Sequence, residues 1–209
     1  MSDSNRHAGL NLGESHGEAD DAADSALFGF WIFLMSDAVI FALLFATYGV
    51  LLPGTAGAPG PGPASGFHLS GTLLETLILL ASSFTFGMAS LVMKHEIGTR
   101  YLYAWLGLTA LLGLAFLALE VKDFAEMASL GAVPSRSGFL SAFYSLVPLH
   151  GLHVAAGLVW IGVMLVQIRV FGCDTPVKLN LLRLGLFWHF LDIVWVAIFS
   201  VVYLQGLIR

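Results

Sequence analysis

Five long apolar runs constrain the fold of this chain more than any other feature. A run of about 20 apolar residues, folded as a helix, matches the roughly 30 Å hydrocarbon core of a lipid bilayer. Of the 209 residues, 57% are hydrophobic and 11% are charged, whereas soluble domains carry about 25% charged residues. The sequence therefore predicts an all-α polytopic membrane protein, a bundle of five transmembrane helices. The predicted helices are about 27–52, 70–93, 101–121, 139–171 and 180–207.

The segment before the first apolar run is polar and acidic. Its acids are opposed by one basic residue, Arg6, and it contains no apolar stretch of the kind that a cleavable signal peptide needs. We expect residues 1–26 to form a polar, acidic cytoplasmic tail that is disordered or loosely bound to the surface. Residues 27–209 are expected to form the transmembrane domain. The acids of the tail are Asp3, Glu14, Glu18, Asp20, Asp21 and Asp24.

The sequence contains a single cysteine, Cys173. A lone cysteine excludes an internal disulfide and a cysteine-based metal cluster.

Basic residues are divided unevenly between the two ends of the predicted bundle. With five spans, the amino-terminal tail shares one side with the second and fourth connections, and the cytoplasmic side of membrane proteins carries the excess of Lys and Arg. We therefore expect the amino terminus in the cytoplasm and the carboxyl terminus outside. The first side carries Arg6, Lys94, Arg100, Arg169, Lys178 and Arg183, and the second carries Lys122, Arg136 and Arg209.

Several ionisable side chains fall inside the apolar runs. Each costs about 2.5–3.5 kcal/mol near the bilayer centre on insertion scales, so each needs a partner or a function. A carboxyl group at the depth of Asp37 can relay protons or bind a cation, or it can bond to a neighbouring helix. We regard all of these residues as candidate structural or proton-related groups. They are Asp37, Glu75, Glu120, His150, His153, His189 and Asp192.

The histidines permit two interpretations. His150 and His153 are three residues apart and share a helix face, and His189 and Asp192 have the same spacing. Three histidines and a carboxylate at one depth could form a metal or haem site. Alternatively, they form hydrogen bonds that join helices. Because no Glu-x-x-His pair recurs on two helices, as a di-iron bundle requires, we favour the second interpretation. It predicts a hydrogen bond from Asp192 that orients His189.

The fourth predicted helix also carries a patch of small residues. Gly151, Ala155, Ala156 and Gly157 offer a smooth surface on which another helix backbone can approach closely. The sequence shows no internal repeat and no pair of broken helices of the kind that secondary transporters use.

Three stretches of the sequence resemble the haem–copper oxidase subunit III family. The first is FGFWIFLMSDAVIFALLFATYGVLL at 28–52, the second is His-Gly-Leu-His at His150–His153, and the third is Trp-His-Phe-Leu-Asp-Ile-Val-Trp at Trp188–Trp195. They occur in the family's order, and the resemblance covers about 27–206. The chain is similar to the cytochrome bo-type ubiquinol oxidase branch, whose third subunit has five helices.

The resemblance implies a function for the chain and roles for two of its acids. Asp37 occupies the position of a carbodiimide-reactive glutamate of the family, and Glu120 matches a family glutamate at the end of its helix. The family's third subunit is not itself catalytic: it contains no catalytic, cofactor-binding or metal-ligating residues. It stabilises subunit I and assists proton uptake.

The resemblance also implies partners and a location. The haem and copper belong to subunit I, which reduces oxygen and pumps protons. Subunit I is the expected direct partner, with subunits II and IV and membrane phospholipids as further partners and no nucleic acid. The expected location is the inner membrane of a bacterium, in an aerobic respiratory electron-transport chain.

Three alternatives stay open at this point. The first is subunit III of a five-helix cytochrome c oxidase, because no residue of the sequence identifies the electron donor. The second is a stand-alone proton or ion transporter that uses Asp37. The third is a membrane metalloenzyme or cytochrome that uses His150, His153 and His189.

Overall fold

A computed structural model of the chain describes residues 16–51, 69–129, 131 and 134–204. Its five long helices are all long and apolar enough to cross a membrane, and the described residues contain no strand. The predicted all-α polytopic bundle is confirmed. The helices are α1 (His16–Leu51), α3 (Leu69–Lys94), α4 (Thr99–Ser129), α5 (Gly138–Phe171) and α6 (Thr175–Ile198), with a short 3-10 turn η2 (Pro134–Arg136) and a π-helical end η3 (Phe199–Leu204).

The helices extend beyond several of the predicted apolar segments. α1 begins at His16, so the second part of the predicted disordered tail is helical, because the acids and alanines there favour the first turns of a helix. Residues 1–15 lie outside the described part of the chain. α4 continues to Ser129 through a polar stretch rich in helix-forming residues. α6 begins at Thr175, with Pro176 in its first turn, where the missing N–H costs nothing.

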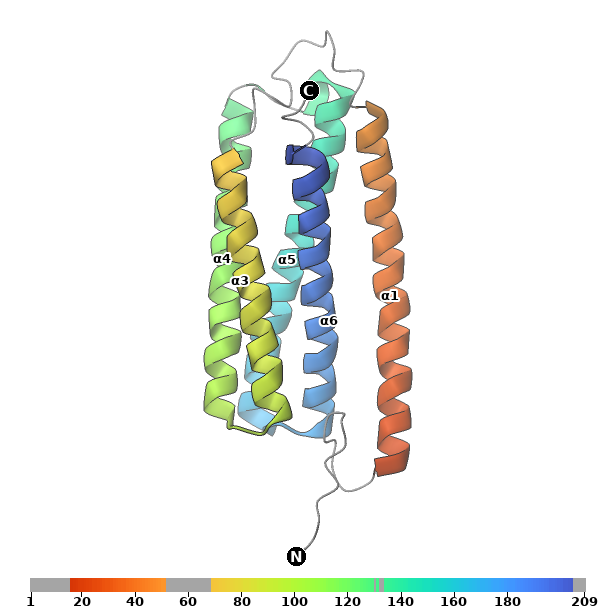
Figure 1. The fold of residues 1–209 in the computed structure, drawn as a ribbon, viewed down its shortest axis with the longest axis vertical. Coiled ribbons are helices and arrows are strands. Elements are labelled where there is room, and N and C mark those ends of the chain that lie inside the picture. The colour runs from red at the N-terminus through yellow and green to blue at the C-terminus, as the bar shows by residue number, and fades with distance from the viewer. Residues whose placement is uncertain (1–15, 52–68, 130, 132–133, 205–209) are drawn as a thin grey trace, which may run out of the picture.

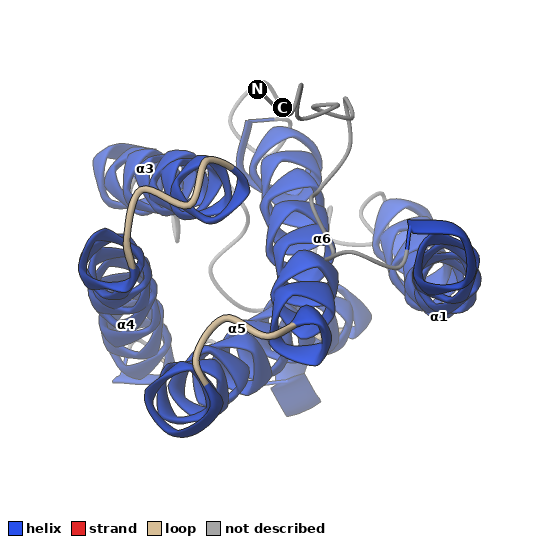
Figure 2. Ribbon diagram, turned by 90° about the horizontal axis from the view of Figure 1, so that it is seen from below, coloured by secondary structure: helices blue, strands red, loops and turns tan. Residues whose placement is uncertain are grey.

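The helices run side by side along the long axis of the molecule, as Figure 1 shows. α3 packs against α4 and α6, and α5 packs against α4 and α6. α1 stands apart from α3 and α4 in the end-on view of Figure 2, and its main contacts are with α5 and α6. Four helices therefore form the core of the bundle, and α1 is attached to one side of it.

Two tryptophans of α6 hold the four-helix core together. Trp188 donates a hydrogen bond from Nε1 to Ser82 Oγ at 3.2 Å, and Trp195 donates from Nε1 to Thr76 Oγ1 at 3.1 Å. Both tryptophans are buried. Inside a bilayer, helix association depends on close packing and interhelical hydrogen bonds, because lipid tails are as apolar as the helices. These bonds therefore fix how α3 and α6 lie against each other.

The turn between α3 and α4 and the loop between α5 and α6 meet at the lower end of Figure 1. Each contains a glycine with a positive φ: Gly98 at 136° and Gly172 at 76°. Glycine adopts this conformation without the Cβ penalty that other residues pay. Lys178 Nζ donates to Glu96 Oε1 at 3.0 Å and joins the two connections. The second and fourth connections of the sequence thus lie on one side, as the order of five spans requires.

Candidate functional site

The predicted intramembrane residues fall into separate groups in the structure. Asp37 and His153 form a pair between α1 and α5, and His189 bonds across to α3. Glu75 and Glu120 line a small cavity near the end of the bundle where α3 begins. Asp192 joins the His189 group, and His150 lies alone among aromatic rings.

The Asp37–His153 pair joins α1 to the rest of the bundle. His153 Nδ1 lies 2.7 Å from the carbonyl oxygen of Leu149, and because a carbonyl only accepts, Nδ1 carries the proton of this bond. His153 Nε2 faces Asp37 Oδ2 at 3.7 Å. Phe41 covers the imidazole, with ring centroids 5.4 Å apart. At this distance the two side chains make an ion-pair contact between helices and not a hydrogen bond.

His150 is fully buried and surrounded by aromatic rings. It stacks on Trp195 with centroids 5.3 Å apart, and Phe116 meets it edge-on at 6.0 Å. Neither of its ring nitrogens has a hydrogen-bond partner among the described residues. These rings offer no oxygen, nitrogen or sulfur ligand, so the surroundings of His150 do not resemble a metal or haem site.

Glu75, Glu120 and Asp123 form an acidic cluster between α3 and α4. Glu75 is 2% exposed, and a cavity of about 10 Å³ lies between the three carboxyl groups and Tyr203 of η3. This volume is close to the least that holds one water molecule. Among the described residues, Glu75 Oε1 and Glu120 Oε1 have no hydrogen-bond partner. Asp123 was not predicted as a member because it lies outside the predicted apolar segment. Tyr203 was not predicted because a tyrosine near the end of a span looks like an ordinary interface residue.

The last group is the His189 cluster, made by Ser83, His189 and Asp192. Ser83 Oγ of α3 lies 2.7 Å from His189 Nδ1 of α6, and the Ser83 hydroxyl also interacts with the Asp192 carboxyl group. No direct hydrogen bond between Asp192 and His189 is found among the described residues, and Ser83 contacts both. That Asp192 orients His189 stays a prediction. Residues three apart on one helix point outward together, and a group on the facing helix reaches both. A serine in an apolar run gave no signal of this role.

The structure directs the three histidines toward different neighbours. His150 faces Trp195, His153 faces Asp37, and His189 faces Ser83. In the part of the chain that the structure describes, no group of three or more His, Cys, Asp or Glu side chains is arranged to hold a metal ion. The contacts of His153 and His189 cross between helices, whereas His150 has no hydrogen-bond partner among the described residues.

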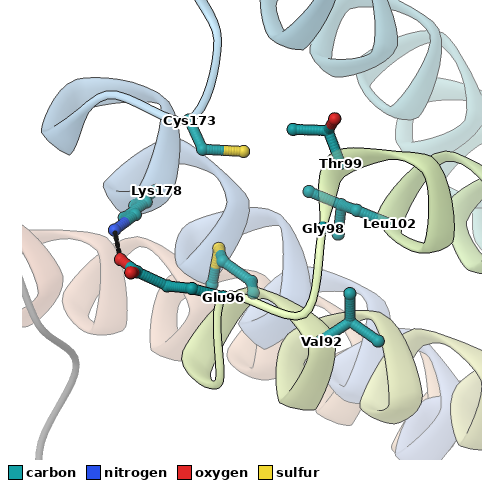
Figure 3. A pocket seen from close by; sticks show the side chains of 8 residues that line it. Val92, Glu96, Gly98, Thr99, Leu102, Cys173 and Lys178 are labelled. Atoms are coloured by element: carbon teal, nitrogen blue, oxygen red, sulfur yellow. Dashed lines mark hydrogen bonds and ion pairs between the residues drawn. The ribbon is translucent and has the colours of Figure 1, made fainter.

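A larger cavity of about 160 Å³ lies where the α3–α4 turn meets the α5–α6 loop, and Figure 3 shows its lining. The Lys178–Glu96 ion pair borders it, and the Cys173 thiol faces Gly98 and Thr99 across it. Burial raises the pKa of the Cys173 thiol, although the charge of Lys178 opposes this effect. A thiol with a raised pKa is a poor nucleophile at neutral pH, so the cavity lacks the features of a cysteine-based active site.

Comparisons with known proteins give one consistent result. Residues 12–207 match the family described as cytochrome c oxidase subunit III. The chain is 48% identical to the cytochrome bo(3) ubiquinol oxidase subunit 3 of Pseudomonas aeruginosa over 195 residues, 93% of this chain and 92% of the relative. It is 40% identical to a probable quinol oxidase subunit 3 of Staphylococcus epidermidis, over 86% of this chain and 89% of the relative. It is 41% identical to a cytochrome c oxidase subunit 3 of a Bacillus species, over 86% of each chain.

Proposed function

Because this chain belongs to the cytochrome c oxidase subunit III family, we propose that it is the non-catalytic third subunit of a bacterial haem–copper ubiquinol oxidase. The observation that carries the proposal is the 48% identity to a ubiquinol oxidase subunit 3 over 93% of the chain. The hydrogen bonds of His189 with Ser83 and of Trp195 with Thr76 join α6 to α3, which supports a structural role for these polar groups.

The chemistry of the complex resides in other subunits. Subunit I holds the haem and copper, takes electrons from ubiquinol and reduces oxygen to water while protons are pumped. This chain packs directly against subunit I and stabilises it during turnover. Subunits II and IV complete the complex, and membrane phospholipids surround it.

The Asp37–His153 pair is the group of this chain best suited to assist proton uptake. It places a carboxyl group and an imidazole 3.7 Å apart on two different helices, near the middle of the α1 span. His153 is half-buried, so the pair is not sealed inside the bundle. The acidic cluster of Glu75, Glu120 and Asp123 lies toward the opposite end from the α3–α4 turn and is a separate group.

The chain is a membrane protein of the bacterial inner membrane, with five membrane-spanning helices. Its orientation follows from the distribution of Lys and Arg. The connections that meet at Lys178 and Glu96 face the cytoplasm together with the amino terminus, and the carboxyl terminus faces the periplasm.

A second candidate is the third subunit of a cytochrome c oxidase. The 41% identity to the Bacillus subunit favours it. The two candidates share the fold, the partners and the non-catalytic role of the chain, and they differ only in the electron donor of the whole complex.

Affinity purification of this chain from native membranes in mild detergent tests the proposal. We expect haem, copper and ubiquinol-driven oxygen consumption to co-purify with the chain and to be lost from it when its partners are stripped away. Oxygen consumption driven by reduced cytochrome c, and not by ubiquinol, would establish the second candidate. A chain that emerges alone, colourless and active in proton transport would contradict both.

A further inference from the structure

The His189 cluster lies on the outer surface of the bundle, near the middle of the membrane. Ser83 and His189 are each close to the midpoint of their spans. His189 is exposed, whereas Asp37, Glu75 and Glu120 are buried. Hydrocarbon chains offer no hydrogen-bond partner, so an exposed imidazole at this depth is costly unless a polar group from outside the chain contacts it.

The imidazole of His189 cannot satisfy itself within its own helix. Its Nδ1 is held by Ser83 Oγ at 2.7 Å, and Phe86 packs edge-on against the ring at 5.9 Å. Within the part of the chain that the structure describes, Nε2 has no hydrogen-bond partner. Ser36 and Thr47 are also exposed, but each bonds to a carbonyl of its own helix. His189 is therefore left with an unsatisfied polar atom that its neighbours hold in place.

The surface around His189 is shaped for another helix. One turn along α3 from Ser83, a Cβ added to Gly87 would meet nothing within 4 Å, so the backbone there is open. Small residues one turn apart let the backbone of a neighbouring helix approach closely. On the same face, Leu80 and Ile193 are exposed apolar side chains. The polar centre thus has an apolar border, as interfaces between transmembrane helices do.

We propose that this surface binds a transmembrane helix of a different subunit, which places a hydrogen-bonding side chain against His189 Nε2. The surface, here called the His189 face, consists of Leu80, Ser83 and Gly87 of α3 with His189, Ile193 and Val196 of α6. The inference rests on the proposed function, because membership of an oxidase supplies partner subunits. Lipid tails cannot form a hydrogen bond with Nε2, and a second copy of this chain is an outcome that the crosslinking below distinguishes.

Photo-crosslinking from single positions tests the proposal in the intact complex. A benzophenone amino acid replaces Ile193, which is 69% exposed on the His189 face, or Leu111, which is 63% exposed on α4. After illumination in native membranes, mass spectrometry identifies the products. We expect Ile193 to crosslink to one transmembrane segment of another oxidase subunit, and the Leu111 control to yield lipid adducts. Lipid adducts at both positions, or a dimer of this chain at Ile193, would overturn the proposal.

A pair of substitutions in the Ile193 crosslinking background tests the hydrogen bond itself. His189→Leu removes it, and we expect loss of most of the crosslinked product. His189→Gln keeps a polar group and should retain the product. Loss in both variants, or in neither, contradicts the hydrogen bond to Nε2. If haem and copper co-purify while Ile193 contacts only lipid, this inference fails and the proposed function stands. If they do not co-purify, the proposed function fails, whatever Ile193 contacts.

Discussion

At the scale of single residues, Trp188 depends on glycines of two neighbouring helices. A Cβ added to Gly113 of α4 would lie 2.9 Å from the ring of Trp188, and one added to Gly157 of α5 would lie 3.0 Å from it. The ring is buried between these backbones, and the hydrogen bond from its Nε1 to Ser82 Oγ restrains it. A side chain at either glycine would therefore press against the tryptophan.

Replacing either glycine by alanine tests this dependence. We expect Gly113→Ala and Gly157→Ala to lower the free energy of unfolding by about 1–3 kcal/mol, as overpacking of a close-packed core does. Gly107→Ala and Gly162→Ala are controls on the same helices, because a Cβ there meets nothing within 4 Å. They should be neutral or stabilising by up to about 1 kcal/mol. Thermal unfolding in detergent provides the measurement, and equal effects in both pairs would show that Trp188 can move.

Cys173 gives a prediction about pH. Burial raises the pKa of its thiol, and Lys178 partly opposes the shift. The thiolate is the nucleophile, so we expect iodoacetamide to alkylate Cys173 more slowly in the folded protein than in the unfolded chain at pH 8. As pH increases, the alkylation rate should rise at a higher pH in the folded protein than in the unfolded chain. Lys178→Met should slow the reaction further, because it removes the charge that favours the thiolate.

A faster reaction in the folded state would contradict the burial of the thiol. The pH–rate profile is simple to interpret because the chain has one cysteine.

At the scale of elements, α1 differs from the other helices in how it is held. Only about 17% of its membrane span is buried in the bundle, against 44% for α3. Its fixed points include the contact of Asp37 with His153 and the hydrogen bond of Tyr48 Oη to the carbonyl oxygen of Val202, at 3.4 Å. The acceptor lies in η3, where the change to π-helical geometry ends α6. Polar contacts therefore hold α1 at two depths, beside the packing of its buried residues Leu34 and Phe41.

The substitution Asp37→Asn distinguishes a role of Asp37 in attaching α1 to the bundle from a role in proton transfer. Asparagine keeps the shape and a hydrogen-bonding group but carries no titratable proton. We expect the complex to assemble and oxygen reduction to remain mostly intact, because the chemistry belongs to another subunit. Ubiquinol-driven oxygen consumption and proton release by the purified complex are the measurements. Complete loss of turnover with normal assembly would show that the carboxyl group of Asp37 is essential.

At the scale of the whole molecule, the two ends of the bundle differ in charge. The end where the α3–α4 turn and the α5–α6 loop meet carries Lys94, Arg100, Arg169 and Lys178, while the acidic cluster lies toward the other end. A basic cytoplasmic side is typical of membrane proteins. The Lys178–Glu96 contact is partly exposed, so it contributes about 0–1 kcal/mol to stability. The asymmetry of charge supports the proposed orientation.

Reporter fusions test this orientation. Alkaline phosphatase folds only outside the cytoplasm, and we expect it to be active when fused after Arg209 and inactive when fused after Gly172. Green fluorescent protein should give the opposite pattern at the same two positions. Phosphatase activity at Gly172 with none at Arg209 would show that the chain lies inverted in the membrane.

The sequence by itself determined the number and order of the helices. Apolar runs of membrane-spanning length leave helices as the simplest structure, because a helix satisfies its backbone groups internally. It also identified the polar residues that need partners, since every ionisable group in an apolar run is exceptional. The helix ends were less well predicted, because polar stretches such as the end of α4 continue a helix beyond the apolar segment.

Only the tertiary structure decided which partner each polar residue has. His150 and His153 share a spacing that suggests one site, yet one lies among aromatic rings and the other faces Asp37. The small patch at Gly151 and Gly157 receives the side chains of Glu120 and Trp188 and not a bare backbone. The physical reason is that spacing along one helix fixes which residues share a face. What that face meets depends on the rotation and position of the neighbouring helices, which packing over the whole bundle sets.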